Sequence, residues 1–145
     1  MFIVRRSTVF ALVSVALAVM SGCATTSHSS PTAAADRGNL STAADRLAAN
    51  TNMFAQATDN APGLGPSGDA SYARDAHSLA DQAQDFRRAA ASNAEQGDLK
   101  AQFDELSRTY QTVKQEVDHS DSQWTKNNWR SVSAAYAELA TQIYG

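Results

Sequence analysis

Cysteine and long apolar runs are scarce in this chain, and each shortage excludes a class of structure. The 145 residues include one cysteine, Cys23, so neither an intramolecular disulfide nor a cysteine-based metal site can form. The longest apolar run, Thr8–Met20, is shorter than the roughly 20 residues that a membrane-spanning helix needs. A Cys-x-x-Cys-His motif is absent, which excludes covalently attached c-type haem.

Basic residues are also in short supply. The chain has 12 Lys and Arg against 15 Asp and Glu, a formal net charge of −3. Removal of residues 1–22 would take two arginines and no acid, so the remaining chain would carry a net charge of about −5. Nucleic-acid binding requires clustered Lys and Arg, and we therefore expect no nucleic-acid partner.

The first 22 residues have the parts of an export signal. Two arginines precede an almost unbroken apolar run, Ser7–Met20, and the segment closes with Met20–Cys23. This stretch resembles the signal of bacterial lipoproteins, in which the cysteine is acylated and the residues before it are removed. The resemblance implies a lipid on Cys23 and, because Ala24 rather than aspartate follows, an outer-membrane location facing the periplasm in a Gram-negative cell. The alternative is an ordinary secretory signal that leaves Cys23 as a free thiol.

The rest of the chain is predicted to be a linker followed by helices. Residues 24–38 are rich in Ser, Thr and Ala without apolar periodicity, which indicates a flexible linker. Beyond it, apolar residues recur every three or four positions, as on one face of an α-helix. The helical segments cover about residues 39–59, 70–93, 98–118 and 122–144. The sequence therefore predicts an all-α fold: a cleaved signal peptide at 1–22, a lipidated Cys23 with a linker at 23–38, and an antiparallel four-helix bundle at 39–145.

The breaks between these segments carry capping residues. Asp69 and Asp98 are predicted N-caps, with Gly97 ending the preceding connection, and Ser120-x-x-Gln123 has the pattern of a capping box. The first two helices are rich in alanine and the last two in aromatic residues. We therefore expect a closer approach between helices on the alanine-rich side.

Aromatic residues of the last two helices are the main candidates for a binding surface. Trp129 lies on the apolar stripe and is predicted to be in the core. Trp124 lies about 140° around the helix from it, so it either closes the end of the bundle or forms an exposed interaction surface with Tyr144 or His119. The stripe from Phe103 to Leu139 resembles small exported bacterial proteins, a likeness that implies no activity.

Metal and haem sites have only weak candidates. His77 and Asp81 are four residues apart on one helix face, and His119 lies beside two aspartates, but a structural zinc site needs four ligands. Haem in a bundle needs two inward ligands, and Met53, His77 and His119 are each displaced by about one position from the apolar stripe. We therefore predict no cofactor.

The sequence also lacks the marks of an enzyme. No serine lies in a Gly-x-Ser-x-Gly motif, and the glycine-rich stretch 63–68 has no phosphate-loop lysine. The prediction is a lipid-anchored cell-envelope protein that binds or spaces another envelope component, without catalysis. The alternatives are a haem- or metal-binding bundle and a holdase-like envelope chaperone.

Overall fold

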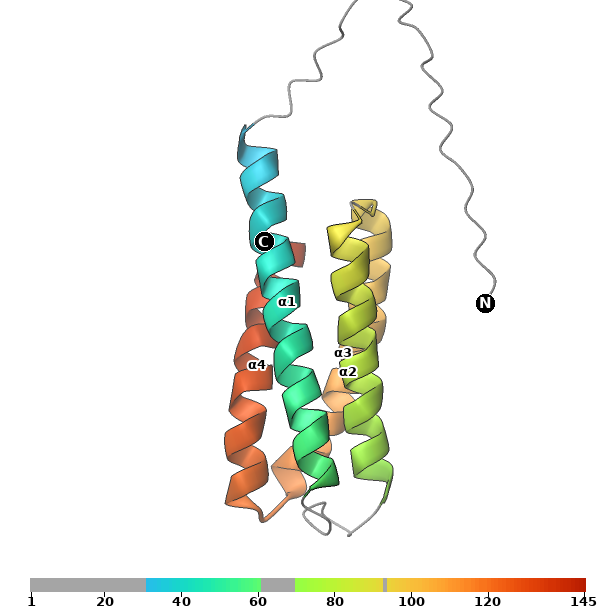
Figure 1. Cartoon of the computed structure of the whole chain (residues 1–145), viewed down its shortest axis with the longest axis vertical. Helices are drawn as coiled ribbons and strands as arrows, with labels where there is room; N and C mark the ends of the chain where they lie inside the picture. The colour runs from blue at the N-terminus through green and yellow to red at the C-terminus, as the bar shows by residue number, and fades with distance from the viewer. Residues whose placement is uncertain (1–30, 61–69, 93) are drawn as a thin grey trace, which may run out of the picture.

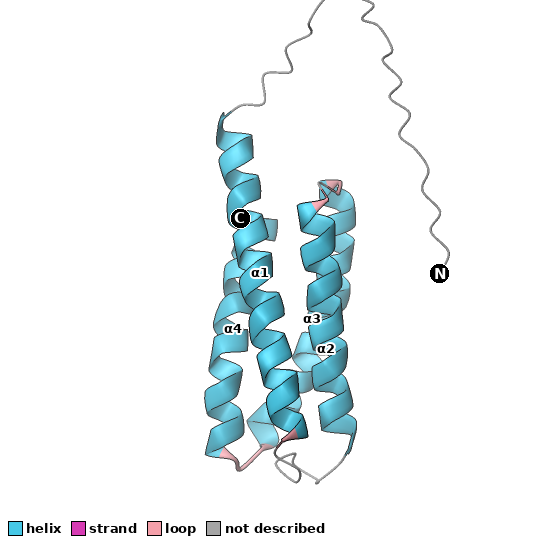
Figure 2. Ribbon diagram, viewed as in Figure 1, coloured by secondary structure: helices cyan, strands magenta, loops and turns pink. Residues whose placement is uncertain are grey.

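The computed structural model describes residues 31–60, 70–92 and 94–145, and over these ranges it consists of helices and short connections without a strand (Figure 2). The helices are α1 (Pro31–Asp59), α2 (Ala70–Ala91), α3 (Gln96–His119) and α4 (Gln123–Tyr144). The prediction of an all-α chain with four helices is confirmed. The predicted signal peptide, Cys23 and the cap Asp69 lie outside the described residues. Among the described helices, none combines the length and the apolar character that crossing a bilayer requires.

Each helix packs against two neighbours around a common core (Figure 1). Rising residue numbers on α1 meet falling numbers on α4, because Arg46 contacts Glu138 whereas Phe54 contacts Trp129. In Figure 1 the chain runs down α1, up α2, down α3 and up α4. Both ends of α4 therefore lie next to the opposite ends of its neighbours, an arrangement that determines which predicted residues can meet.

Helix α1 begins at Pro31, eight residues earlier than predicted, so the second half of the predicted linker is helical. Proline suits the first position of a helix, and the alanines that follow have the highest helix propensity. Apolar periodicity reports the burial of one face, and the side chains of residues 36–39 in this segment are all exposed. Figure 1 shows the start of α1 extending beyond the other three helices.

The predicted N-cap of α3 is wrong by three residues. The helix begins at Gln96, and Glu95 occupies the N-cap position without a capping hydrogen bond from its side chain. Gly97 is therefore inside the first turn rather than before it. Asp98 also lies in this turn, where its negative charge interacts favourably with the positive end of the helix dipole.

The predicted cap of α4 is displaced by two residues. Ser122 is the N-cap, and its hydroxyl accepts a hydrogen bond from the backbone N–H of Thr125 at 3.2 Å. Ser120 instead accepts a bond from the backbone N–H of Ser122 through its hydroxyl, also at 3.2 Å. Ser120 thus orders the turn that precedes the helix, and Ser122 satisfies the first free donor of the helix itself.

The two sides of the bundle are packed differently. Most of the buried apolar residues of α1 and α2 are alanines, and the backbones of these two helices approach more closely than those of the other neighbouring pairs. The backbones of α3 and α4 approach least. The predicted asymmetry is confirmed, because small side chains permit close approach whereas aromatic rings hold helices apart. The buried alanines of α1 and α2 are Ala43, Ala44, Ala48, Ala55, Ala76, Ala80 and Ala83.

A column of stacked rings joins α3 to α4. Trp129 stacks on Tyr110 with ring centroids 5.1 Å apart, Tyr110 on Tyr136 at 3.7 Å, and Tyr136 on Phe103 at 5.3 Å. The hydroxyls of the two tyrosines each donate a hydrogen bond to a serine hydroxyl of the facing helix, at 3.0 and 2.9 Å. Trp129 is 5% exposed, so its predicted place in the core is confirmed.

Candidate functional site

The two residues predicted to form one interaction surface lie at opposite ends of α4. Trp124 is the second residue of this 22-residue helix and Tyr144 is its last, which places them about 30 Å apart along the helix axis. Both side chains are exposed, Trp124 by 39% and Tyr144 by 52%. The prediction that Trp124 and Tyr144 share a surface is therefore wrong. Trp124 is not among the buried core residues, and its predicted alternatives, closing the end of the bundle or an exposed surface with His119, stay predictions.

Tyr144 is fixed against the neighbouring helix. Its ring meets the ring of Phe103 edge to face at 5.8 Å, and the ammonium group of Lys100 lies 4.7 Å from the centroid of its ring. Its hydroxyl donates a hydrogen bond to Asp104, which raises the pKa of Tyr144 above its usual value. These contacts give Tyr144 a structural role in holding the end of α4 to α3.

Trp124 belongs to a different surface, the flank where α1 meets α4. Polar contacts bridge the upper part of this flank. The guanidinium of Arg46 donates to both carboxylate oxygens of Glu138 at 2.8 and 2.9 Å, and the side-chain amide of Asn50 donates to the backbone carbonyl of Ser131 at 3.1 Å. The spacing of residues along each helix shows which other side chains lie on this flank below the two contacts.

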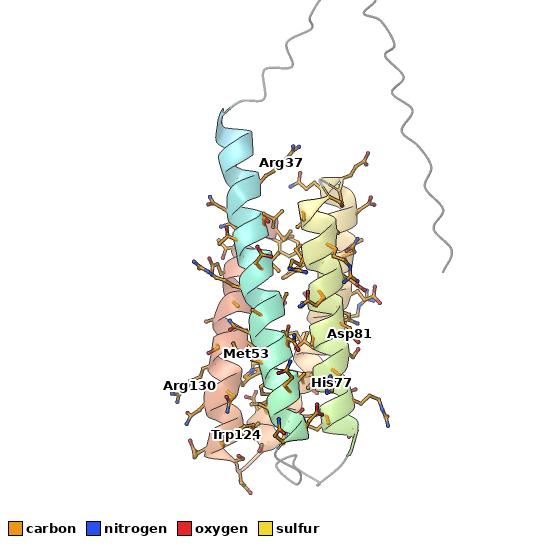
Figure 3. All side chains as sticks on the ribbon, viewed as in Figure 1. Arg37, Met53, His77, Asp81, Trp124 and Arg130 are labelled. Atoms are coloured by element: carbon orange, nitrogen blue, oxygen red, sulfur yellow. The ribbon has the colours of Figure 1, made fainter. Side chains whose placement is uncertain are left out.

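Met53 and Trp124 continue this flank. Met53 comes three residues after Asn50 on α1, and Trp124 comes seven residues before Ser131 on α4, so each lies close to the same face of its helix as the bridging residue. Met53 is 60% exposed. Figure 3 shows both residues on the side formed by α1 and α4, toward the end opposite to the start of α1. We call Met53 and Trp124, with the flank between them, the α1–α4 face.

The first two thirds of α4 differ in charge from the whole chain. From Gln123 to Ala137, α4 contains Lys126 and Arg130 but no acidic residue. Arg130 is exposed, forms no ion pair with any described residue, and points outward from α4 in Figure 3. An anionic protein thus has an acid-free, basic stretch on α4, about 120° around this helix from Trp124 in the case of Arg130.

His77, a weak metal-ligand candidate together with Asp81, contacts another carboxylate in the structure. Its Nε2 atom lies 3.0 Å from both carboxylate oxygens of Asp59, at the end of α1. Asp81 is exposed one turn further along α2 (Figure 3). Asp59 could not be found from spacing, because it is brought to His77 by the packing of the end of α1 against the start of α2.

The remaining metal and haem candidates lie on the outer surface. His119 is exposed and its Nδ1 atom hydrogen-bonds the backbone carbonyl of Gln115 at 2.6 Å. Met53 is exposed as well, so neither it nor the two histidines point into the core. Over the described ranges, no three His, Cys, Asp or Glu side chains gather closely enough to hold a metal ion.

A polar cluster that the sequence did not reveal lies in the core near the lower end of the bundle. The hydroxyls of Tyr72 and Thr125 are both buried and lie side by side without a hydrogen bond of standard geometry. Burial raises the pKa of the Tyr72 phenol far above its usual value, the carboxylate of Glu116 raises it further, and contact with Thr125 offsets part of the rise. Tyr72 is thus held in its neutral form.

The surface also has a hollow between α2 and α3, with a volume of about 410 Å³. Its lining residues lie one or two turns apart on each helix, namely Gln82, Asp85 and Ala89 of α2 with Gln102 and Glu105 of α3. We call this hollow the α2–α3 groove. It was not predicted, because its polar residues look like an ordinary solvent-facing stripe until the two helices are placed together.

Comparisons with protein families, with curated proteins and with solved structures found no match to this chain. The contacts, burial and charges of the chain's own residues are therefore the basis for its proposed function.

Proposed function

We propose that this protein is a cell-envelope lipoprotein, anchored through Cys23, whose helical bundle binds another envelope protein without catalysing a reaction. The proposed anchor rests on the resemblance of Met20–Cys23 to the lipoprotein signal. Ala24 after the cysteine favours the outer membrane, facing the periplasm, in a Gram-negative cell.

The early start of α1 supports a spacing role for the bundle. Seven residues separate Cys23 from Pro31, and they can span at most about 25 Å. Helix α1 has 29 residues and is about 43 Å long. The α1–α4 face lies toward the far end of α1, so a membrane-tethered bundle is able to present this face well away from the lipid surface.

The observation that carries the proposal is the exposure of Met53 and Trp124 on the α1–α4 face. Large apolar side chains that are exposed on one side of a protein are typical of protein-binding surfaces, where Trp and Met are enriched. Buried residues of this bundle are already packed among themselves, so Met53 and Trp124 contribute little to the core.

The anchor is tested by membrane fractionation and intact mass. Wild-type protein is expected in the membrane fraction with acyl mass on Cys23, since several acyl chains hold a protein far more firmly than one. A Cys23→Ser variant is expected in the soluble fraction or with its leader uncleaved, and without acyl mass. Ala24→Asp is the matched variant: it should keep the lipid and shift the protein to the inner membrane. Recovery of wild-type protein without acyl mass would contradict the proposed anchor.

Partner binding is tested by site-specific photo-cross-linking in intact cells. A photoreactive phenylalanine at position 53 and, separately, at position 124 should give the same protein adduct, because both positions lie on the α1–α4 face. Gln111 of α3 is exposed, outside this face, and serves as the control position. The proposal fails if positions 53 and 124 give no adduct, or if position 111 gives the same one.

A further inference from the structure

We propose that the α2–α3 groove binds an organic cation, either an ammonium or a guanidinium group. This site lies on other helices than the α1–α4 face and does not depend on the proposed partner. It is assigned from the chemistry of its lining residues, which supply acceptors and negative charge.

Gln82 provides an acceptor that the protein itself does not use. Its side chain lines the groove, while its Oε1 atom is buried beneath the groove surface without a hydrogen bond. An unsatisfied buried acceptor costs about 1–3 kcal/mol. Rotation of the Gln82 amide toward a donor in the groove therefore gains one hydrogen bond and breaks none.

Two carboxylates give the groove its preference for a cation. Glu105 forms no hydrogen bond or ion pair with any described residue, and Asp85 pairs only with Arg88. Both side chains of that pair are more than 60% exposed, at 66% and 63%, so the pair is weak and a ligand can compete with Arg88. Asp98 lies on the same flank of α3 as Glu105 and adds negative charge at one end.

The size and composition of the groove favour an organic cation over a bare metal ion. A volume of about 410 Å³ is within the usual range of small-molecule sites, and the small side chain of Ala89 leaves this space open. Over the described residues no three His, Cys, Asp or Glu side chains gather as metal ligands, whereas the two carboxylates and two amide oxygens of the groove can accept hydrogen bonds from an ammonium or a guanidinium group.

Two sources can supply this chemistry: a free polyamine, or the side chain of a lysine or arginine on another protein. The test is calorimetric titration of the full chain in detergent micelles with spermidine and, separately, with a short neutral peptide that contains one arginine. Backbone amide chemical shifts recorded during each titration locate the bound molecule. Fully acetylated spermidine, which has lost its charge, is the control ligand and is expected not to bind.

Two variants test the location of the site. Asp85→Asn combined with Glu105→Gln removes the charge of the groove, and Ala89→Leu fills its space; each should weaken binding at least tenfold. The matched control is Asp81→Asn combined with Glu95→Gln, which removes the same charge from exposed acids outside the groove and should change the affinity less than threefold. If Ala89→Leu fails to fold, the charge variant and the shifts at residues 82–89 and 102–105 decide the location.

The possible outcomes separate the sources and can overturn the proposal. Binding of spermidine alone indicates a free polyamine, and binding of the arginine peptide alone indicates a protein side chain; binding of both supports the shared chemistry. Equal weakening by the groove and control variants would show attraction to general surface charge and overturn the site. Absence of binding of either probe at millimolar concentration, or full retention of binding by a folded Ala89→Leu variant, would overturn it as well.

Discussion

Tyr72 illustrates how a single buried hydroxyl shapes the properties of the bundle. Its ring packs edge to face on Phe54 at 6.0 Å, as a core aromatic should, but its hydroxyl lies in the interior beside Thr125 and Glu116. A phenol in this environment resists ionisation, because a charged phenolate would be desolvated and would repel the carboxylate. The free energy of unfolding is therefore expected to change with pH in the alkaline range.

We expect the free energy of unfolding to fall above about pH 10, the ordinary pKa of tyrosine in the unfolded chain. The folded-state pKa is raised, so above this pH the unfolded chain releases a proton that the folded protein retains, and unfolding becomes easier. One such group changes stability by up to about 1.4 kcal/mol per pH unit.

A Tyr72→Phe variant has no phenol proton at this position. Its free energy of unfolding should therefore fall less steeply than that of the wild type as the pH rises above about 10. Urea unfolding at several pH values between 9 and 11 measures this effect. The difference in free energy of unfolding between wild type and variant cancels the contribution of the other tyrosines. At neutral pH the variant should be at least as stable as wild type, because it removes a buried hydroxyl without a good partner. Parallel pH profiles for the two proteins would contradict this account of Tyr72.

His77 shows the limit of reading single residues from spacing. Its position four residues before Asp81 made these two residues weak candidates for metal ligands, whereas the structure joins His77 to Asp59 of the preceding helix at 3.0 Å. Spacing within one helix predicts only which residues share a face. Spacing does not predict that the end of α1 packs beside the start of α2 and so brings Asp59 next to His77.

At the scale of elements, the packing of α3 against α4 is made by aromatic rings, whereas alanines form much of the buried surface of α1 and α2. The stacked column of Trp129, Tyr110, Tyr136 and Phe103 fills the wide space between α3 and α4. Loss of one ring therefore leaves a cavity that the separated backbones cannot close. Loss of an exposed side chain leaves none.

We predict that Tyr110→Ala destabilises the protein by about 3–5 kcal/mol, as is typical when a large buried aromatic is truncated. Met53→Ala, at an exposed position of α1, should change the free energy of unfolding by less than about 0.5 kcal/mol. Thermal and urea unfolding followed by circular dichroism measure both. If the two variants were equally stable, the ring column would not be what holds α3 and α4 together.

The boundary predicted between the linker and the first helix is also wrong, because α1 begins at Pro31. The linker was inferred from the absence of apolar periodicity, and that criterion detects a helix only where one of its faces is buried. Residues 31–38 have high helix propensity but project past the bundle, so their helix leaves no periodic signal in the sequence.

At the scale of the whole molecule, the position of the tryptophans relative to the membrane is testable. If the protein is tethered through Cys23 and projects from the membrane, Trp124 and Trp129 lie tens of ångströms from the lipid, because they are on the part of α4 that packs beside the far end of α1, a helix about 43 Å long. Their fluorescence in lipid vesicles should not be quenched by brominated acyl chains. An additional tryptophan introduced as Arg37→Trp, near the start of α1, should be quenched more. Strong quenching of the native tryptophans would mean that the bundle lies flat on the membrane.

The sequence by itself determined the helical class, the four helices and the stripe residues that form the core. This was possible because a buried helix face imposes a period of three to four on the apolar residues, whatever the helix packs against. The same reasoning placed Trp129 in the core. Residue chemistry alone also restricted the sole cysteine to roles other than a disulfide within the chain.

Only the tertiary structure decided which side chains meet. Met53 was brought to the same side as Trp124, and Asp59 to His77, by the packing of α1 against its neighbours. The separation of Trp124 from Tyr144, in contrast, already follows from their positions at opposite ends of one predicted helix. The α2–α3 groove likewise exists only once two helices lie side by side. Such contacts join residues far apart in the chain, and their geometry depends on helix register and separation, which a local pattern does not encode.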